Sequence, residues 1–136
     1  MAQIDAYLFF DGNCAEAMQF YAGILGGKLE VMKYKDGPPG SAPPELGERV
    51  MHACITVGDR RLMASDTMPK YPHEGNKGFA VSVHVPSAAE AKRVFDALAA
   101  GGKVGMPIEK TFWAEAFGML TDKFGIPWMI GGGATS

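Results

Sequence analysis

The chain has 136 residues, of which 47% are hydrophobic and 21% charged, a balance typical of a globular domain with a sizeable apolar core. The net charge of −2 and the absence of long like-charged runs argue against a nucleic-acid-binding patch or a basic membrane-binding surface. No apolar stretch reaches the roughly 18 residues that a membrane span needs. The N-terminal segment lacks the basic region of an export signal, so we expect the protein in the cytoplasm. Cys14 and Cys54 lie far apart and form no CxxC motif, so we expect both to be free thiols.

The first segment predicts a strand that leads into an amphipathic helix. On the strand we expect Tyr7 and Phe9 to face the helix, and the alternate set to face away: Ala6, Leu8 and Phe10. Asn13 is a good N-cap residue, and Glu16 three places later completes a pattern resembling a capping box. The helix then carries an apolar stripe at i, i+3, i+4 and i+7, made of Ala17, Phe20, Tyr21 and Ile24.

Three further strands are expected in the first half, at residues 28–34, 50–57 and 61–65, with a hairpin turn at Gly58-Asp59. On the middle strand an apolar set alternates with a more polar set, which we place toward a cavity: His52, Cys54 and Thr56. Residues 36–48 and 66–77 are rich in proline and glycine and lack periodicity. Such long segments are either binding loops or plain surface connections.

The second half repeats the first at an offset of 74 residues. Ser87 and Glu90 take the places of the first cap and its acidic partner, and the apolar stripe recurs as Ala91, Val94, Phe95 and Leu98. A glycine pair ends each helix, and three strands follow at 103–108, 116–121 and 126–130. On the strand before the second helix we expect valines toward the helix and Ala80, Ser82 and His84 away from it, and we assign Trp128 to the helix-facing core.

The repeat predicts an α+β fold of two tandem βαβββ modules, at about 4–66 and 78–131, joined by a linker at 67–77 within a single domain. One helix covers only one sheet face, so we expect the modules to form a curved mixed sheet around a cavity suited to a small molecule. The residues predicted to contact this ligand are Leu8, Phe10, His52, Ser82, His84, Trp113, Phe117 and Met129.

Four side chains are candidates for catalysis. His52 and His84 lie on predicted strands and are suited to proton transfer or hydrogen bonding, although isolated histidines are more often structural. Asp66 is placed to orient a ligand amine or a histidine, or simply to end a strand. Glu115 is either a pocket carboxylate or a solvated one. The sequence leaves open whether the chain is an enzyme.

Several other residues have two interpretations each. Trp113 and Phe117 are suited to stacking on a flat ligand, and equally to packing in a core or a dimer interface. The nine methionines indicate an adaptable apolar cavity. Cys14 is near a helix N-terminus, which would lower its pKa, but a small buried residue is the stronger interpretation.

The chain resembles the vicinal-oxygen-chelate superfamily, which includes glyoxalase I, extradiol dioxygenases and bleomycin-resistance proteins. Within it, the sequence is most similar to the PhnB-like branch, often labelled 3-demethylubiquinone-9 3-methyltransferase-like. The resemblance is carried by YLFFDGNCAEAMQFYAGILGG, MHACITVGDRRLMASD and GGKVGMPIEKTFWAEAFGMLTDKFGIPWMI. It implies paired βαβββ modules in a glyoxalase/bleomycin resistance-like fold and a frequent homodimer. No glycine-rich nucleotide-binding loop supports the methyltransferase label.

The resemblance also implies four metal-ligand positions, on the first, fourth, fifth and eighth strands. They fall on residues that are not metal ligands: Ala6, the segment 62–64 (Leu, Met, Ala), Ala80 and Met129. We therefore expect no metal and no cofactor. The sequence predicts a metal-free small-molecule binding protein with an apolar or aromatic ligand, acting as a homodimer without nucleic acid or membrane. The alternatives are an enzyme with histidine and acid catalysis, and a metal-dependent lyase or dioxygenase.

Overall fold

The computed structural model describes residues 2–40 and 42–133, and the chain divides into two compact units with the boundary between Glu74 and Gly75. The first unit contains β1 (Ala6–Phe10), α1 (Cys14–Leu25), β2 (Lys28–Lys33), β3 (Val50–Val57) and β4 (Arg60–Asp66). The second contains β5 (Val81–Val85), α2 (Ala88–Ala99), β6 (Lys103–Glu109), β7 (Ala116–Thr121) and β8 (Pro127–Gly132). Two 3₁₀ turns, η1 (Tyr34–Asp36) and η2 (Pro44–Leu46), lie between β2 and β3.

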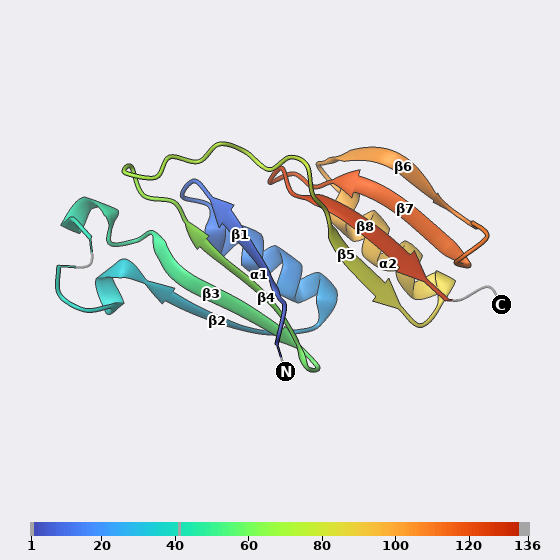
Figure 1. The fold of residues 1–136 in the computed structure, drawn as a ribbon, viewed down its shortest axis with the longest axis horizontal. Coiled ribbons are helices and arrows are strands. Elements are labelled where there is room, and N and C mark those ends of the chain that lie inside the picture. The colour runs from blue at the N-terminus through green and yellow to red at the C-terminus, as the bar shows by residue number, and fades with distance from the viewer. Residues whose placement is uncertain (1, 41, 134–136) are drawn as a thin grey trace. The chain divides into compact units, whose positions relative to one another are not determined.

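The two units have the same topology. Each has a four-stranded mixed sheet, in the order β1-β4-β3-β2 or β5-β8-β7-β6. The first pair in each order is parallel and the others are antiparallel. In each unit one helix lies against one face of the sheet (Figure 1). The predicted α+β class and the βαβββ repeat are confirmed. In the described part of the chain, no helix is long and apolar enough to cross a membrane.

The predicted orientation of β1 is wrong. Leu8 and Phe10 are only 2% and 1% exposed, whereas Tyr7 and Phe9 are 39% and 50% exposed. Because β1 pairs in parallel with β4, its side chains share a face with their register partners, and Leu8 lies beside the fully buried Ala64. The prediction failed because both alternating sets on β1 are apolar, so periodicity alone does not tell the two faces apart.

The predicted orientation of β5 is confirmed. Val81 and Val83 pair with Trp128 and Ile130, which are fully buried on the side of the sheet that packs against α2. Ser82 and His84 alternate with the valines and are exposed. The four residues of the α2 stripe are all buried: Ala91, Val94, Phe95 and Leu98. The alternation was informative here because only one of the two sets is apolar.

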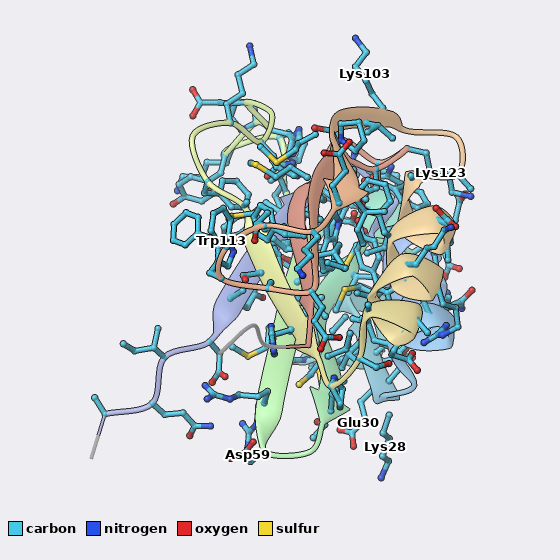
Figure 2. The ribbon with its side chains drawn as sticks, turned by 90° about the vertical axis from the view of Figure 1, so that its right-hand side faces the viewer. Lys28, Glu30, Asp59, Lys103, Trp113 and Lys123 are labelled. Carbon is cyan, nitrogen blue, oxygen red and sulfur yellow. The ribbon has the colours of Figure 1, made fainter. Side chains whose placement is uncertain are left out.

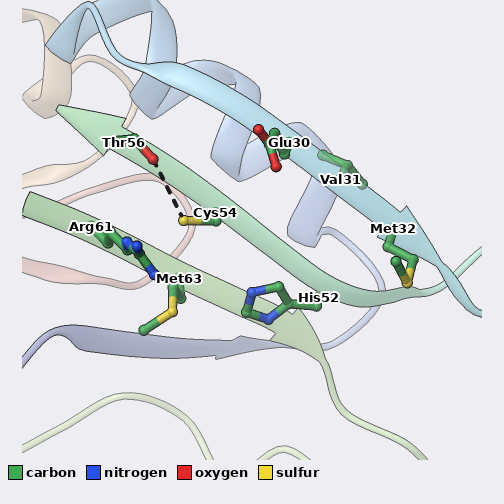
Figure 3. Close-up of a pocket in the computed structure, with 8 residues that line it drawn as sticks. All are labelled: Glu30, Val31, Met32, His52, Cys54, Thr56, Arg61 and Met63. Atoms are coloured by element: carbon green, nitrogen blue, oxygen red, sulfur yellow. Dashed lines mark hydrogen bonds between the residues drawn. The ribbon is translucent and has the colours of Figure 1, made fainter.

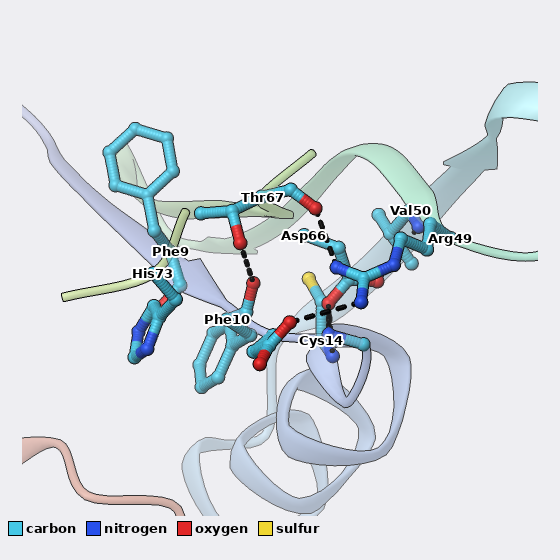
Figure 4. A network of polar contacts seen from close by, with 10 residues as sticks. Phe9, Phe10, Cys14, Arg49, Val50, Asp66, Thr67 and His73 are labelled. Carbon is cyan, nitrogen blue, oxygen red and sulfur yellow. Dashed lines mark hydrogen bonds and ion pairs between the residues drawn. The ribbon is translucent and has the colours of Figure 1, made fainter. Parts of the chain in front are cut away.

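The two helices begin in different ways. Asn13 makes no side-chain cap bond to α1, so the predicted capping box is wrong there. Instead the buried carboxylate of Asp66, at the end of β4, accepts hydrogen bonds from the backbone N–H groups of Gly12 at 2.8 Å and Cys14 at 3.0 Å (Figure 4). Its other oxygen accepts one from Val50 at 2.9 Å. A carboxylate at this place also interacts favourably with the positive end of the helix dipole.

In the second unit the cap is local, as predicted. The Ser87 hydroxyl accepts a hydrogen bond from the backbone N–H of Glu90 at 3.2 Å. Gly132 pairs with the last residue of β5, as Asp66 does with the last residue of β1. A Cβ on Gly132 would lie 2.4 Å from the Ser87 carbonyl oxygen, so this position has no room for a capping side chain. The repeat therefore preserves the topology but not the capping chemistry.

The Asp66 bonds predict a large effect of a small substitution. Asp66→Asn keeps the side-chain size but removes the charge and one acceptor, which leaves buried N–H groups poorly bonded. We expect the free energy of unfolding to fall by about 2–4 kcal/mol, measured by urea denaturation. The matched control is Asp59→Asn, because that side chain is 98% exposed in the β3–β4 turn. Equal stability of the two variants would contradict the assigned role of Asp66.

Candidate functional site

The sheet face opposite α1, here called the open face of the first unit, carries alternate residues from all four strands. It consists of Tyr7, Phe9, Lys28, Glu30, Met32, His52, Cys54, Thr56, Arg61 and Met63, which the strand register brings side by side. The prediction that His52, Cys54 and Thr56 share one side of β3 is confirmed. The opposite set on β3 is buried toward α1 at Ala53 and Ile55.

A hollow of about 470 Å³ lies on this face (Figure 3). Its lining comes from β2, β3 and β4 and combines thioether, aliphatic, imidazole, hydroxyl, thiol and charged groups: Glu30, Val31, Met32, His52, Cys54, Thr56, Arg61 and Met63. The volume is within the range of small-molecule sites in proteins. The lining therefore combines groups that can hydrogen-bond or pair with a charge and adaptable apolar groups such as Met32 and Met63.

An aromatic pair borders the hollow. The Tyr7 hydroxyl and the Nδ1 atom of His52 are 3.1 Å apart and share a hydrogen bond, and their rings are 5.7 Å apart between centroids. The Phe9 ring follows at 5.2 Å from that of Tyr7. The Nε2 atom of His52 makes no hydrogen bond to the part of the chain that the structure describes. The shared bond thus holds the imidazole ring in place and leaves Nε2 available to bond a ligand.

Tyr7 was missed by the sequence prediction, which placed it toward the helix. Two of the residues predicted as ligand contacts, Leu8 and Phe10, instead lie in the core beneath α1 and do not reach the open face. Asp66, predicted as a catalytic candidate, is also turned toward α1, where three backbone N–H groups occupy its carboxylate. The parallel pairing of β1 with β4 is the information that would have placed Tyr7 on the open face.

The second unit has its own open face, opposite α2. Ser82, His84, Phe117 and Met129 share this face through the register of β5, β8 and β7. Gly131 lies between two of them, and a Cβ there would be 3.4 Å from His84 Nδ1 and 3.7 Å from the Phe117 ring. The structure thus brings together four residues predicted as ligand contacts, and their contact with a ligand stays a prediction.

Aromatic side chains extend from this face into the loop before β7. The Trp113 ring is 5.3 Å from that of Phe117 and 4.7 Å from that of Phe112, in edge-on geometry. Figure 2 labels Trp113 among the side chains. Glu115, the remaining catalytic candidate, is exposed, and its carboxylate lies against the backbone of Gly133. This placement puts the Glu115 carboxylate beside the last described residue of the second unit.

The residues present do not fit a metal ion. Within the described ranges 2–40 and 42–133, neither unit holds a group of three or more His, Cys, Asp or Glu side chains able to bind one. Ala6 shares the buried face with Leu62, so the nearest open-face residue on β1 is Tyr7. Neither is a metal ligand of the kind that enzymes with divalent metals use.

The two cysteines differ in environment. Cys14 is fully buried at the start of α1, and its burial, together with the negative charge of Asp66, raises its pKa from 9.0 to about 12. The favoured interpretation of Cys14 as a small buried residue is confirmed, and its pKa is raised and not lowered because desolvation outweighs the helix dipole. Since folding raises this pKa, the thiol favours the folded state below pH 9 and loses that contribution as the pH rises toward 12. Cys54 lies in the hollow.

This difference predicts selective labelling. At pH 8 we expect a thiol reagent such as 5,5′-dithiobis(2-nitrobenzoate) to modify Cys54 but not Cys14 in the folded protein, because only Cys54 is accessible. Released thiolate measured by absorbance should correspond to one cysteine, and to both in denaturant. Cys54→Ala should abolish the native reaction and Cys14→Ala should leave it unchanged. Rapid labelling of the Cys54→Ala protein would contradict the burial of Cys14.

Comparison with known proteins connects this fold to a family. A sequence profile described as the Glyoxalase/Bleomycin resistance protein/Dioxygenase superfamily matches residues 3–130. The chain is 37% identical to Protein YjdN of Escherichia coli K12, over 93% of this chain and 92% of that protein. It is 49% identical to protein PA1353 of Pseudomonas aeruginosa, whose crystal structure matches with a TM-score of 0.90 over 98% of both chains.

A third relative is named for a function. A putative 3-demethylubiquinone-9 3-methyltransferase, PhnB protein, from Bacillus cereus is 26% identical, with a TM-score of 0.78 over 96% of this chain and 99% of that one. This similarity confirms the PhnB-like resemblance seen in the sequence. A fosfomycin resistance protein, FosX, from Mesorhizobium loti matches with a TM-score of 0.63 at 6% identity, which shows a shared fold alone.

Proposed function

Since the chain belongs to the Glyoxalase/Bleomycin resistance protein/Dioxygenase superfamily, we propose that it is a small-molecule binding protein whose ligand lies on the open face of the first unit and is held without a metal ion. The observation that carries this proposal is the hollow of about 470 Å³ between Met32, His52 and Met63. A concave surface of this size suits a small organic molecule better than a macromolecular partner.

The lining favours a ligand with an apolar or aromatic body. Met32 and Met63 offer flexible thioethers that adapt to irregular shapes and contact ring edges favourably. The rings of Tyr7, Phe9 and His52 adjoin them in a continuous series with neighbouring centroids 5.2–5.7 Å apart. Offset or edge-on stacking between such rings and a flat ligand adds to the free energy gained by apolar burial.

The residue types at this site support the proposal that binding is independent of metal. The superfamily's metal chemistry needs oxygen or nitrogen ligands that converge on one ion, which neither unit provides among the described residues. Binding must then come from stacking, apolar contact and hydrogen bonds of this chain's own side chains. Stoichiometric zinc, iron, manganese or nickel in protein purified without chelator would contradict this part of the proposal.

The surroundings of the site support two further parts of the proposal. Tyr7, Phe9 and Met32 are exposed on the open face, and a patch of this kind is usually covered in the working protein. We therefore propose a homodimer whose assembly covers part of this face and encloses the ligand.

Cys14 and Cys54 are both free thiols, which suits a reducing compartment such as the cytoplasm.

A second candidate function is acid–base catalysis, favoured by the hydrogen bond between Tyr7 and His52. The shared bond fixes the imidazole orientation, and protonation of one ring nitrogen affects the other. Asp66 is removed from this role because its carboxylate is occupied at the start of α1. The catalytic group would thus be a histidine–tyrosine pair in place of the expected histidine–acid pair.

The binding proposal predicts that ligands protect Cys54. In a thermal-shift screen of small aromatics and antibiotics, we expect some compounds to raise the melting temperature in a concentration-dependent way. The same compounds should slow labelling of Cys54, because that thiol lines the hollow. The Cys14→Ala protein serves as the labelling background with one reactive cysteine. Stabilising compounds that leave the labelling rate unchanged would place the ligand elsewhere.

The catalytic candidate predicts turnover of such a compound. Incubated with protein and followed by mass spectrometry, it should be converted, and His52→Gln and Tyr7→Phe should each reduce the rate by about 10²-fold or more. His84→Gln tests the other histidine candidate, which belongs to the second unit, in the same assay. Quantitative recovery of the unchanged compound would remove the catalytic function and leave the binding function.

A further inference from the structure

The strand register orders the open face of the first unit by chemistry. Met63 of β4 lies between Tyr7 of β1 and Cys54 of β3, and Glu30 of β2 follows at the edge. Toward one end of this row lie aromatic and thioether side chains, Phe9, His52 and Met32. Toward the other end, Arg61 of β4 lies opposite Thr56 of β3 in the strand register, and Thr56 lies opposite Lys28 of β2. The face is therefore apolar and aromatic at one end and cationic at the other.

Arg61 differs from the other arginines of the chain. Arg49, Arg60 and Arg93 each have a carboxylate within ion-pair distance: Asp11, Asp59 and Glu90 respectively. Among residues 2–40 and 42–133, no such partner lies beside Arg61, although it lines the hollow. A guanidinium presents several N–H donors in a planar fork that matches a carboxylate, so this position is suited to an acidic ligand group.

Two neighbours strengthen the position of an anion at Arg61. Thr56 lies opposite Arg61 on the adjacent strand, with its hydroxyl 3.9 Å from Cys54 Sγ (Figure 3). When the thiol donates in that contact, the hydroxyl can donate to a ligand at the same end of the hollow. Glu30 is the one carboxylate in the lining, and it is separated from Arg61 by the whole width of β3. Lys28 Nζ lies 3.7 Å from Glu30 Oε1 and offsets the charge of that carboxylate. Glu30 is thus paired with Lys28 on one side of β3, and Arg61 lies on the other side.

The distance along β4 limits the size of the ligand. Arg61 and Met63 are two residues apart on one face of a strand, which corresponds to about 7 Å. Met63 in turn lies beside Tyr7 in the parallel register. A molecule with its acidic group at Arg61 therefore needs a body of about 7 Å, the length of two fused rings, to reach Tyr7, whose hydroxyl shares a hydrogen bond with His52.

From this arrangement we infer that the ligand of the open face is an amphipathic organic anion. Its carboxylate or similar acidic group binds Arg61 and Thr56, and its apolar or aromatic body covers Met63 and reaches Tyr7 and His52. This inference rests on the proposed binding function and adds the chemical class of the ligand.

The test compares an acid with its neutral analogue of nearly equal shape. Dissociation constants of 2-naphthoate and 2-naphthylmethanol are measured by calorimetry for the wild type, Arg61→Gln and Arg60→Gln. The wild type should bind 2-naphthoate about tenfold more tightly, as one charge-assisted contact at a partly solvated site provides. Arg61→Gln should abolish this preference, and Arg61→Lys should retain part of it.

Arg60→Gln is the matched control, because it removes the same charge from the residue before Arg61. The Arg60 side chain is 83% exposed beside Asp59. The preference of Arg60→Gln for the acid should equal that of the wild type. Equal binding of the two probes by the wild type, or an unchanged preference in Arg61→Gln, would overturn the inference while leaving the binding function in place. Failure of both probes to bind the wild type would overturn the binding function at this face, and the inference with it.

Discussion

A single helix covers only one face of a four-stranded sheet, and the rest of this structure depends on that constraint. In each unit the buried residues of the helix and the alternate residues of the strands form the core, and the other sheet face is left to carry different chemistry. Because side chains alternate along a strand, core and open face are specified by the same segments. A shift of one residue in register would exchange them.

The two halves show how a duplicated unit diverges under this constraint. Their strand orders are the same, but α2 begins with a serine cap from its own chain segment, whereas α1 begins at a carboxylate from β4. At the start of α1, Arg49 adds hydrogen bonds to Asp11 and to the Thr67 carbonyl (Figure 4). The structural use of Asp66 also has a functional consequence, since one of the two acids expected to act with a histidine is withdrawn from the open face.

Much of the fold was predictable from the sequence because several local signals agreed. Helix caps and stripes recur at an offset of 74 residues and the glycine stops at 75, and the polar–apolar alternation on β3 and β5 is a separate signal. Each of these signals is a short-range property. The failures involve long-range pairing. On β1 both alternating sets are apolar, so only its parallel pairing with β4 determines that Leu8 is buried and Tyr7 open. Likewise, the capping role of Asp66 spans more than fifty residues and leaves no local pattern.

The central claim is that the open face of the first unit is where the ligand binds, and methionine methyl resonances test it most directly. In protein labelled with ¹³C at the methionine methyl groups, Met32 and Met63 line the hollow, whereas Met18 is buried beneath the other face. Addition of a ligand should shift the resonances of Met32 and Met63 and leave that of Met18 unchanged. Shifts confined to Met119 and Met129 of the second unit would contradict the account.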